Sequence, residues 1–173
     1  MVSDVIWVAI YARPRREVPL RPLMEERFRV GADLMYTRRF QKAIALQVGD
    51  RKLSFFGGPS GSNPDAQHLV YAGCVTQKAR PLEQADLKDY PELFRLTIEM
   101  FPHFQTAPGL LERQGIIKYQ LFRPPPGVMP LPRPFQQPRP GDNFKRFVPS
   151  DPEYPQLDDW WHAVVPRGQC GNE

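Results

Sequence analysis

The stretch His68–Gln77, HLVYAGCVTQ, is the clearest strand in this sequence, and it decides the fold class that we predict. Its apolar, β-branched and aromatic residues are typical of a buried strand. Lys52–Phe56, KLSFF, precedes it as a second strand. The residues between them, 57–65, are glycine, proline, serine, asparagine and aspartate, which predicts a surface loop. We therefore expect the two strands to form an antiparallel pair.

Two more stretches have strand character. Val5–Ala12, VIWVAIYA, is short, β-branched and aromatic, and Ile116–Phe122, IIKYQLF, alternates in polarity. Both patterns favour strands rather than helices.

Helical spacing is found in two places. Residues 85–101 carry an apolar stripe and end before Pro102, which predicts one helix. The stripe consists of Leu87, Tyr90, Phe94, Ile98 and Phe101. A second helix begins near Leu23, and Gly31 weakens it or divides it in two.

Proline separates the chain into parts. Eleven of the 21 prolines lie between Pro124 and Pro155. We expect residues 1–122 to form a compact α+β domain, 123–155 to form an extended proline-rich arm, and 156–173 to form an acidic, tryptophan-rich tail. Prolines disfavour a regular ladder or helix interior, so a stiff wrap over the domain is the expected state of the arm.

Bulk composition restricts the function only mildly. The net charge of the 173 residues is +4, which permits nucleic-acid binding without requiring it. Cys74 and Cys170 are the two cysteines, and their spacing does not suggest zinc. Cys74 lies in an apolar run and is predicted to be a buried thiol. The N-terminus does not resemble a signal peptide, and no apolar run is long enough to span a bilayer, so we expect a cytoplasmic, reduced protein without membrane contact.

Five arginines form the candidate phosphate-binding set: Arg13, Arg15, Arg16, Arg38 and Arg39. The forked guanidinium donors suit phosphate oxygens. The alternative is a solvated charged surface with a few ion pairs.

Four aromatic residues are candidates for stacking on a base: Trp7, Tyr36, Phe55 and Tyr71. Single-stranded or flipped bases are held by aromatic faces beside cationic side chains. The alternative is that these rings belong to the cores of strands.

The remaining polar groups give weaker signals. His68, His103 and His162 have no partner at metal-binding spacing, so no metal and no cofactor are predicted. The run Asp158–His162, DDWWH, is either a catalytic or recognition tail, or a tail whose tryptophans hold the chain end on the domain. We favour the second interpretation.

Three short motifs together carry a family resemblance: Val48-Gly49-Asp50, then Leu69–Thr76, then Gly141-Asp142-Asn143-Phe144. This arrangement resembles the nucleotide-modification-associated domains of the PUA-like superfamily, which includes the EVE, ASCH and YTH domains. The resemblance implies a small bent β-barrel with flanking helices and an aromatic pocket that accepts a flipped base. It also marks Gly49, Tyr71 and three polar contacts, namely Asp50, Asp142 and Asn143.

We therefore predict an α+β fold: a small mixed or antiparallel, barrel-like sheet with two main helices and the proline-rich arm. The first functional hypothesis is a DNA- or RNA-binding module that recognises a modified or flipped base. The alternative is a protein–protein interaction subunit or inhibitor that uses residues 124–173. A magnesium-dependent nuclease built on Asp142, Asp158 or Asp159 is the weakest hypothesis, so an enzyme is not the favoured interpretation.

Overall fold

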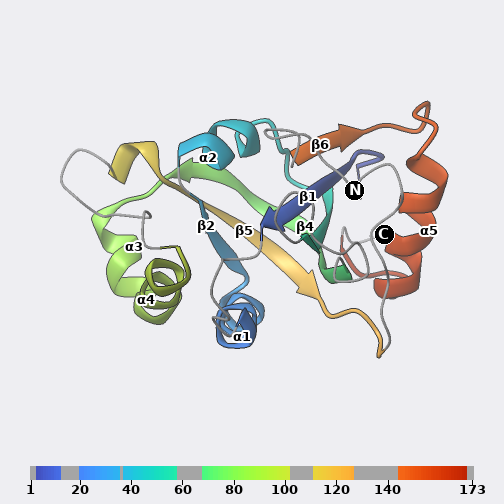
Figure 1. The fold of residues 1–173 in the computed structure, drawn as a ribbon. Coiled ribbons are helices and arrows are strands. Elements are labelled where there is room, and N and C mark those ends of the chain that lie inside the picture. The colour runs from blue at the N-terminus through green and yellow to red at the C-terminus, as the bar shows by residue number, and fades with distance from the viewer. Residues whose placement is uncertain are drawn as a thin grey trace. The chain divides into compact units, whose positions relative to one another are not determined.

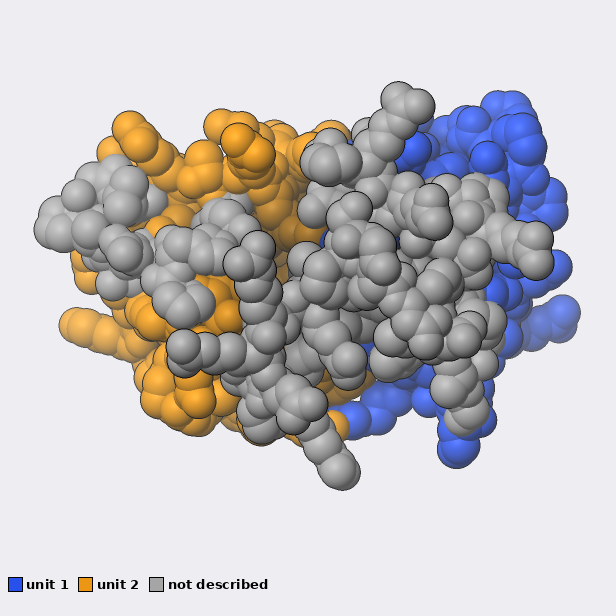
Figure 2. Space-filling model, in the orientation of Figure 1, with its two compact units in different colours: residues 1–15, 49–75, 120–173 blue, residues 16–48, 76–119 orange. Residues whose placement is uncertain are grey.

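The structure, a computed structural model, describes residues 3–12, 20–35, 37–57, 68–101, 111–126 and 144–170. The chain divides into two compact units, which Figure 2 colours separately. Unit 1 comprises residues 1–15, 49–75 and 120–173, and unit 2 comprises residues 16–48 and 76–119. Within the described residues the architecture is α+β, as predicted, with one mixed sheet and with five α-helices where two main helices were predicted (Figure 1).

The sheet has six strands in the order β2-β5-β4-β3-β1-β6. The strands are β1 (Ile6–Ala12), β2 (Ala32–Met35), β3 (Arg51–Gly57), β4 (His68–Pro81), β5 (Gly115–Phe122) and β6 (Phe144–Phe147). β1 and β3 are parallel, whereas β1 with β6, β2 with β5, and β3 with β4 are antiparallel. The order begins at β2 and ends at β6, so the sheet is not closed, and the predicted barrel-like closure is not found.

Side chains in unit 1 alternate between the two faces of its strands. Ile6, Val8 and Ile10 of β1 share a face with Leu53 and Phe55 of β3. Helix α5 (Tyr154–Val164) covers this face with Leu157, Trp161 and Val164 (Figure 1). The i, i+4, i+7 spacing of these three residues makes the apolar stripe that holds α5 on the core.

Unit 2 has its own core. Its helices are α1 (Leu20–Val30), α2 (Thr37–Ala43), α3 (Gln84–Asp89) and α4 (Pro91–Met100), with a 3₁₀ turn at Leu111–Arg113. Leu23 of α1 packs in one cluster with Leu93, Leu96 and Met100 of α4. The core also encloses an ion pair of 2.9 Å between Arg27 and Asp33, both almost fully buried.

Gly31 divides the predicted helix that begins near Leu23, as expected, but the two helical pieces, α1 and α2, are separated by a strand. Gly31 has a φ of 64°, which ends α1 because residues with a Cβ rarely adopt it. Its carbonyl accepts a 2.8 Å hydrogen bond from the amide of Tyr119. Residues 32–35 then form β2, a strand that the sequence analysis missed.

The predicted helix over residues 85–101 is two helices. Pro91 is the first residue of α4 and follows Tyr90, which caps both helices in a non-helical conformation. The break shifts the buried face, so Leu93, Leu96 and Met100 are buried while the predicted stripe residues lie half-buried at the edge of the core.

The chain after β5 differs from the predicted arm and tail where it is described. Residues 144–147 form β6 beside β1, so this part of the arm is regular structure. Residues 156–164 of the predicted tail belong to helix α5, and Trp161, 4% exposed, holds it on the core as the favoured interpretation required. Residues 127–143 lie outside the described residues, so the extended wrap is not confirmed.

The cysteines correct one prediction. Cys74 is buried in the core of unit 1, as expected, but it is not a free thiol because it pairs with Cys170 in a disulfide. The two Cα atoms are 5.7 Å apart, within the range of disulfide-linked residues. The cytoplasmic location, which rested on the N-terminus and on the apolar runs of the sequence, stays a prediction. Among the described helices none is long and apolar enough to cross a membrane.

Candidate functional site

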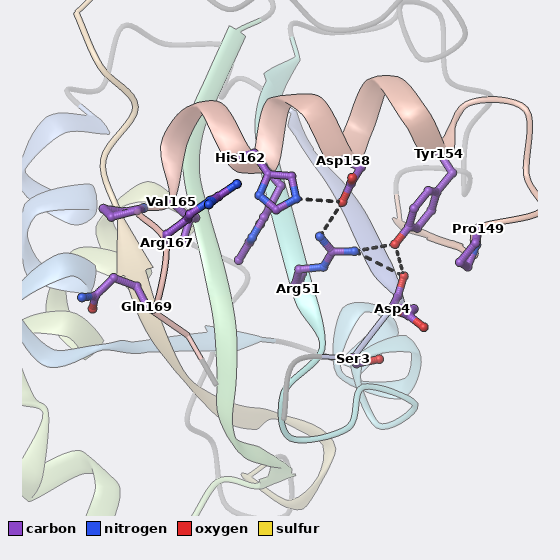
Figure 3. Close-up of a pocket in the computed structure, with 13 residues that line it drawn as sticks. Ser3, Asp4, Arg51, Pro149, Tyr154, Asp158, His162, Val165, Arg167 and Gln169 are labelled. Carbon is purple, nitrogen blue, oxygen red and sulfur yellow. Dashed lines mark hydrogen bonds and ion pairs between the residues drawn. The ribbon is translucent and has the colours of Figure 1, made fainter. Parts of the chain in front are cut away.

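The most distinctive site in unit 1 is a polar hollow between helix α5 and the start of β3, which we call the α5 hollow (Figure 3). Its volume is about 440 Å³, and it is lined by residues 3–4, 51, 149, 154, 158, 161–162 and 165–169. Cavities of roughly 300–1,000 Å³ hold small molecules or parts of larger ligands. The size therefore suits one ligand group of the dimensions of a nucleotide.

Arg51 is the central residue of the hollow. As the first residue of β3 it shares a face with Leu53 and Phe55, which directs its side chain toward α5. The side chain is 5% exposed, and its Nη1 donates a 2.8 Å hydrogen bond to Asp158 Oδ1. Its Nη2 donates to the hydroxyl of Tyr154 at 2.5 Å and to the carbonyl of Asp4 at 3.4 Å.

One donor of this guanidinium is not used by the protein. The Nε atom of Arg51 is buried and has no hydrogen-bond partner among the groups that the structure describes. A buried donor without a partner is costly, and in native structures such groups often mark a ligand or water position. The guanidinium therefore keeps one N–H without a described acceptor, at an atom that is covered and not exposed in the hollow.

Two aromatic rings flank the same guanidinium. The Arg51 Cζ atom lies 5.8 Å from the ring centroid of Tyr154 and 5.6 Å from that of Trp161. Cations at this distance from ring faces are stabilised by the ring quadrupole, more so when water is excluded. Both rings come from α5 and belong to or pack on the core of unit 1, so the site is preorganised by the fold.

Tyr154 connects Arg51 to the N-terminal segment. Its hydroxyl accepts from Arg51 and donates a 2.5 Å hydrogen bond to the carbonyl of Asp4. Burial raises the pKa of the Tyr154 hydroxyl above its usual value of 10.0, and the charge of Asp158 raises it further, while Arg51 acts in the opposite direction. The hydroxyl therefore stays protonated near neutral pH and keeps its donor role.

The more exposed part of the hollow carries His162 and Arg167. His162 Nε2 lies 3.4 Å from Asp158 Oδ1, one helical turn away, and the imidazole is 64% exposed. Arg167 and Gln169 are exposed residues of the segment that follows α5. The hollow thus contains both hydrogen-bond donors and acceptors. Among the described residues, no group of three or more potential metal ligands is found.

The predicted phosphate-binding arginines are not shown at this hollow. Arg13, Arg15 and Arg16 lie outside the described residues. Arg38, which is exposed, and Arg39, which is half-buried, lie on α2 of unit 2. Their phosphate-binding role stays a prediction.

The structure brings together two of the predicted stacking residues. Trp7 and Tyr71 lie on the face of the unit 1 strands opposite to α5, and they are 6% and 0% exposed. Trp7 Nε1 donates to Asp50 Oδ2 at 3.0 Å, and Lys52 Nζ donates to the Tyr71 hydroxyl at 3.1 Å. Trp7, Asp50, Lys52 and Tyr71 thus form a buried polar and aromatic layer. Asp50, which was predicted as a polar contact, accepts its hydrogen bond there from Trp7.

The other predicted residues are separated from that layer. Phe55 is fully buried on the α5 face and contacts the ring of Trp160, with centroids 5.4 Å apart. Tyr36, Asp142 and Asn143 lie outside the described residues. In the described structure the rings of Trp7, Phe55 and Tyr71 do not offer an open face to a base.

Sequence reasoning missed Arg51, Tyr154 and Arg167 as candidates. One signal was present: Pro155 followed by Leu157 and Trp161 at i, i+4, which is the pattern of a helix start and an apolar stripe. No local signal marks Arg51, because its partners are 47 and 107 residues away in the chain.

Comparisons with known proteins give little further information. No family model matches the chain, and no curated protein matches it. A crystal structure of a Pseudomonas putida protein from a structural genomics consortium is similar, with 19% identity and a TM-score of 0.44. The similarity covers 89% of this chain and 97% of that one.

Proposed function

We propose that this protein is a nucleic-acid-binding module that accepts one extruded or single-stranded base in the α5 hollow. The observation that carries the proposal is the buried Arg51, which lies between the rings of Tyr154 and Trp161 with its Nε atom unused. A bound base needs hydrogen bonds to its edge and contact with its faces. The hollow supplies groups for the edge, and the half-buried ring of Tyr154 is the aromatic group that lines it with surface left for a base; Trp161 is buried in the core.

The polar groups of the hollow suit the edge of a base. Arg51 donates, the carboxylate of Asp158 accepts, and the amide of Gln169 can do both. Arginine and carboxylate side chains are common partners of base edges because their hydrogen-bonding atoms are coplanar. A purely anionic ligand would be a poorer match, since Asp158 already neutralises part of the charge of Arg51.

The exposed cations suit the phosphate that accompanies a base. Arg167 lies at the hollow, and Lys145 and Arg146 are exposed residues of β6 in the same unit. Phosphate contacts of this kind fix the position of a nucleic acid without reading its sequence. A phosphate-binding role for the predicted set Arg13, Arg15, Arg16, Arg38 and Arg39 remains part of this proposal, because guanidinium groups suit phosphate oxygens.

The PUA-like resemblance motivates the finer part of the proposal, a modified base as the preferred ligand. In that superfamily the pocket belongs to a closed barrel, whereas the sheet of this chain is open. We therefore assign the base to the α5 hollow and not to the layer around Trp7 and Tyr71.

The experiment is a titration of fluorescently labelled single-stranded DNA and RNA, followed by anisotropy at salt concentrations from about 50 to about 200 mM. We expect affinity to fall steeply with salt because phosphate contacts release counterions. R167A should weaken binding and reduce the slope of log K against log salt by about one. The matched control is R95A, since Arg95 is an exposed arginine of α4 that already pairs with Glu92 and Glu99.

Two results would reject the proposal. One is the absence of binding to any of these oligonucleotides at low salt. The other is equal affinity of R167A and R95A. The base-accepting role has its own test: a duplex with one mismatched pair should bind more tightly than the fully paired duplex, because the mismatched base is cheaper to extrude.

The alternative proposal, a protein partner that binds residues 124–173, has one supporting observation. Helix α5 keeps Gln156, Asp159 and Ala163 exposed, and their i, i+3, i+7 spacing puts them on one side of the helix. A complex that Q156R and A163R disrupt, with nucleic-acid binding unchanged, would support this alternative instead.

A further inference from the structure

The segment that follows α5 is attached to the core of unit 1 by chemistry that depends on redox conditions. Residues 166–169 form part of the wall of the α5 hollow, and Cys170 comes directly after them. Cys170 is joined to Cys74 of β4, 96 residues earlier in the chain. These are the only two cysteines of the protein.

Cys74 places the disulfide next to Arg51, the central residue of the hollow. Cys74 is the direct cross-strand partner of Arg51 in the antiparallel pair of β3 and β4. Side chains of directly opposed residues lie on the same face, about 4.5–5.5 Å apart at Cβ. The disulfide therefore fixes the wall of the hollow beside the residue at its centre.

The wall itself is a tight turn. The amide of Gln169 donates to the carbonyl of Pro166 at 3.2 Å, and Gly168 has a φ of 78°. These features define a type II turn, in which glycine is favoured at the third position. The turn fixes only its own four residues, so it does not by itself attach the segment to the core.

Among the described residues, few hydrogen bonds join residues 166–169 to another element, while Val165 and Cys170 on either side are buried. Residues 166–169 are exposed, and the described hydrogen bond from them to another element is a 3.4 Å contact between Gln120 and Gln169. Cys170 is 4% exposed and has a φ of 63°, a left-handed conformation that is unfavourable for a residue with a Cβ. Such a conformation persists where surrounding structure imposes it, and the bond to Cys74 is the constraint found here.

We propose that the Cys74–Cys170 pair is an oxidative clamp: when it is oxidised, residues 166–170 close one side of the α5 hollow, and when it is reduced they detach. In the closing reaction the two thiols lose their hydrogens and form one S–S bond. A small-molecule disulfide such as glutathione disulfide accepts the two electrons and two protons, and its own S–S bond breaks to give two thiols. Reduction by a dithiol is the reverse exchange.

Both sulfurs lie in the buried core, which predicts how the reduction proceeds. Cys74 and Cys170 are 3% and 4% exposed, so a reductant reaches them only after the segment opens. Reduction of the folded protein should therefore be slow and should become faster in mild denaturant. The clamp, once formed, would keep the hollow closed through brief changes in redox conditions.

The first test counts thiols. The protein is incubated with glutathione disulfide, unfolded without reductant and titrated with a thiol reagent, and we expect no reactive thiol. After treatment with dithiothreitol we expect two. Two reactive thiols in the oxidised sample would overturn the proposal.

The second test measures hydrogen exchange of residues 165–170 in both forms by mass spectrometry. We expect the Gln169 amide to exchange about tenfold faster or more in the reduced form, because the cross-link no longer restrains the segment. The Tyr119 amide, bonded to Gly31 in unit 2, is the internal control and should not change. C170S should reproduce the reduced pattern with or without dithiothreitol, and equal exchange of Gln169 in the two forms of the wild-type protein would overturn the clamp.

A consequence for ligand binding rests on the proposed function. If the hollow accepts a base, the oxidised form should bind the oligonucleotides of the previous section more tightly than the reduced form. Absence of binding in both forms rejects the nucleic-acid proposal, whereas the exchange experiment decides the clamp independently.

Discussion

Arg51 of β3 and Asp158 of α5 form an ion pair of 2.8 Å between residues that are 107 positions apart. The arginine is almost completely buried, while the carboxylate is 33% exposed. Removing the carboxylate would leave a buried guanidinium without its charged partner, which is the costly way to break such a pair. The pair is thus both a structural contact of α5 and a boundary of the hollow.

The first prediction concerns this pair. We expect D158N to lower the free energy of unfolding by about 1–3 kcal/mol, because a charge-assisted hydrogen bond to Arg51 is weakened. D159N is the matched control, since Asp159 is the exposed neighbour on the same helix and should change stability by less than about 0.5 kcal/mol. Urea denaturation measures both, and equal stability of the two variants would contradict the role of the ion pair.

The second prediction concerns the contact between α5 and the core. L157A should cost about 2–5 kcal/mol because Leu157 is fully buried in the unit 1 cluster. Q156A, at the exposed position beside it, should be nearly neutral. Thermal denaturation distinguishes the two variants, and a small effect of L157A would show that α5 is only loosely attached. Because Leu157 and Trp161 belong to the core of unit 1, removing residues 124–173 would destabilise the protein and could not be used to test their role in binding.

The third prediction compares two glycines with similar backbones. Gly31 and Gly168 have φ values of 64° and 78°, so alanine is strained at both positions by about 1–2 kcal/mol. At Gly31 an added Cβ would also lie 2.7 Å from the carbonyl oxygen of Tyr119, whereas at Gly168 it would meet nothing within 4 Å. G31A should therefore destabilise the protein clearly more than G168A in denaturant titrations. The reverse order would be incompatible with the described contact.

The fourth prediction concerns the pH dependence of stability. Asp86 of α3 accepts two 2.7 Å hydrogen bonds from Arg80 and one of 2.8 Å from the amide of Glu83. The bonds from Arg80 are the largest cause that lowers the pKa of Asp86 below its usual value, and burial acts in the opposite direction. The folded state therefore holds the proton less tightly than the unfolded state.

The direction of the pH dependence follows from the lower pKa of Asp86 in the folded state. The contribution of Asp86 is present above the pKa of an unfolded aspartate, about 3.9, and is lost as the pH falls further through the lower folded value. D86N should remove this part of the acid dependence and cost about 1–3 kcal/mol at neutral pH. D89N, at an exposed position of the same helix, should leave the acid dependence unchanged. Parallel pH profiles of D86N and the wild-type protein would show that Asp86 does not contribute.

Local pattern explains how much of the fold could be predicted. β1, β3 and β4 have the composition of buried strands, and the antiparallel pairing of β3 with β4 is confirmed. β2 was missed because its four residues, ADLM, are too few to establish a period of two. Helix α5 was taken for a tail because its prolines and acidic residues obscured the stripe of Leu157, Trp161 and Val164.

The candidate site could not be predicted by the same means. Its central residue meets Asp4, Tyr154 and Asp158 only after three distant segments have assembled, and nothing in the sequence near Arg51 indicates these partners. The cysteines show the same limitation: a separation of 96 residues carries no signal of pairing. At Asp158–His162 the residue types allowed either a functional tail or a tail held by its tryptophans, and only the tertiary structure showed that Asp158 pairs with Arg51.

Unit 1 is assembled from three separate segments of the chain, and this discontinuity has a consequence for biosynthesis. A nascent chain that has been translated through β5 already contains all of unit 2, yet it lacks every residue that α5 contributes to the hollow. The hollow therefore cannot form during the early stages of folding, because residues 149–169 complete its lining only after the rest of the chain has been translated.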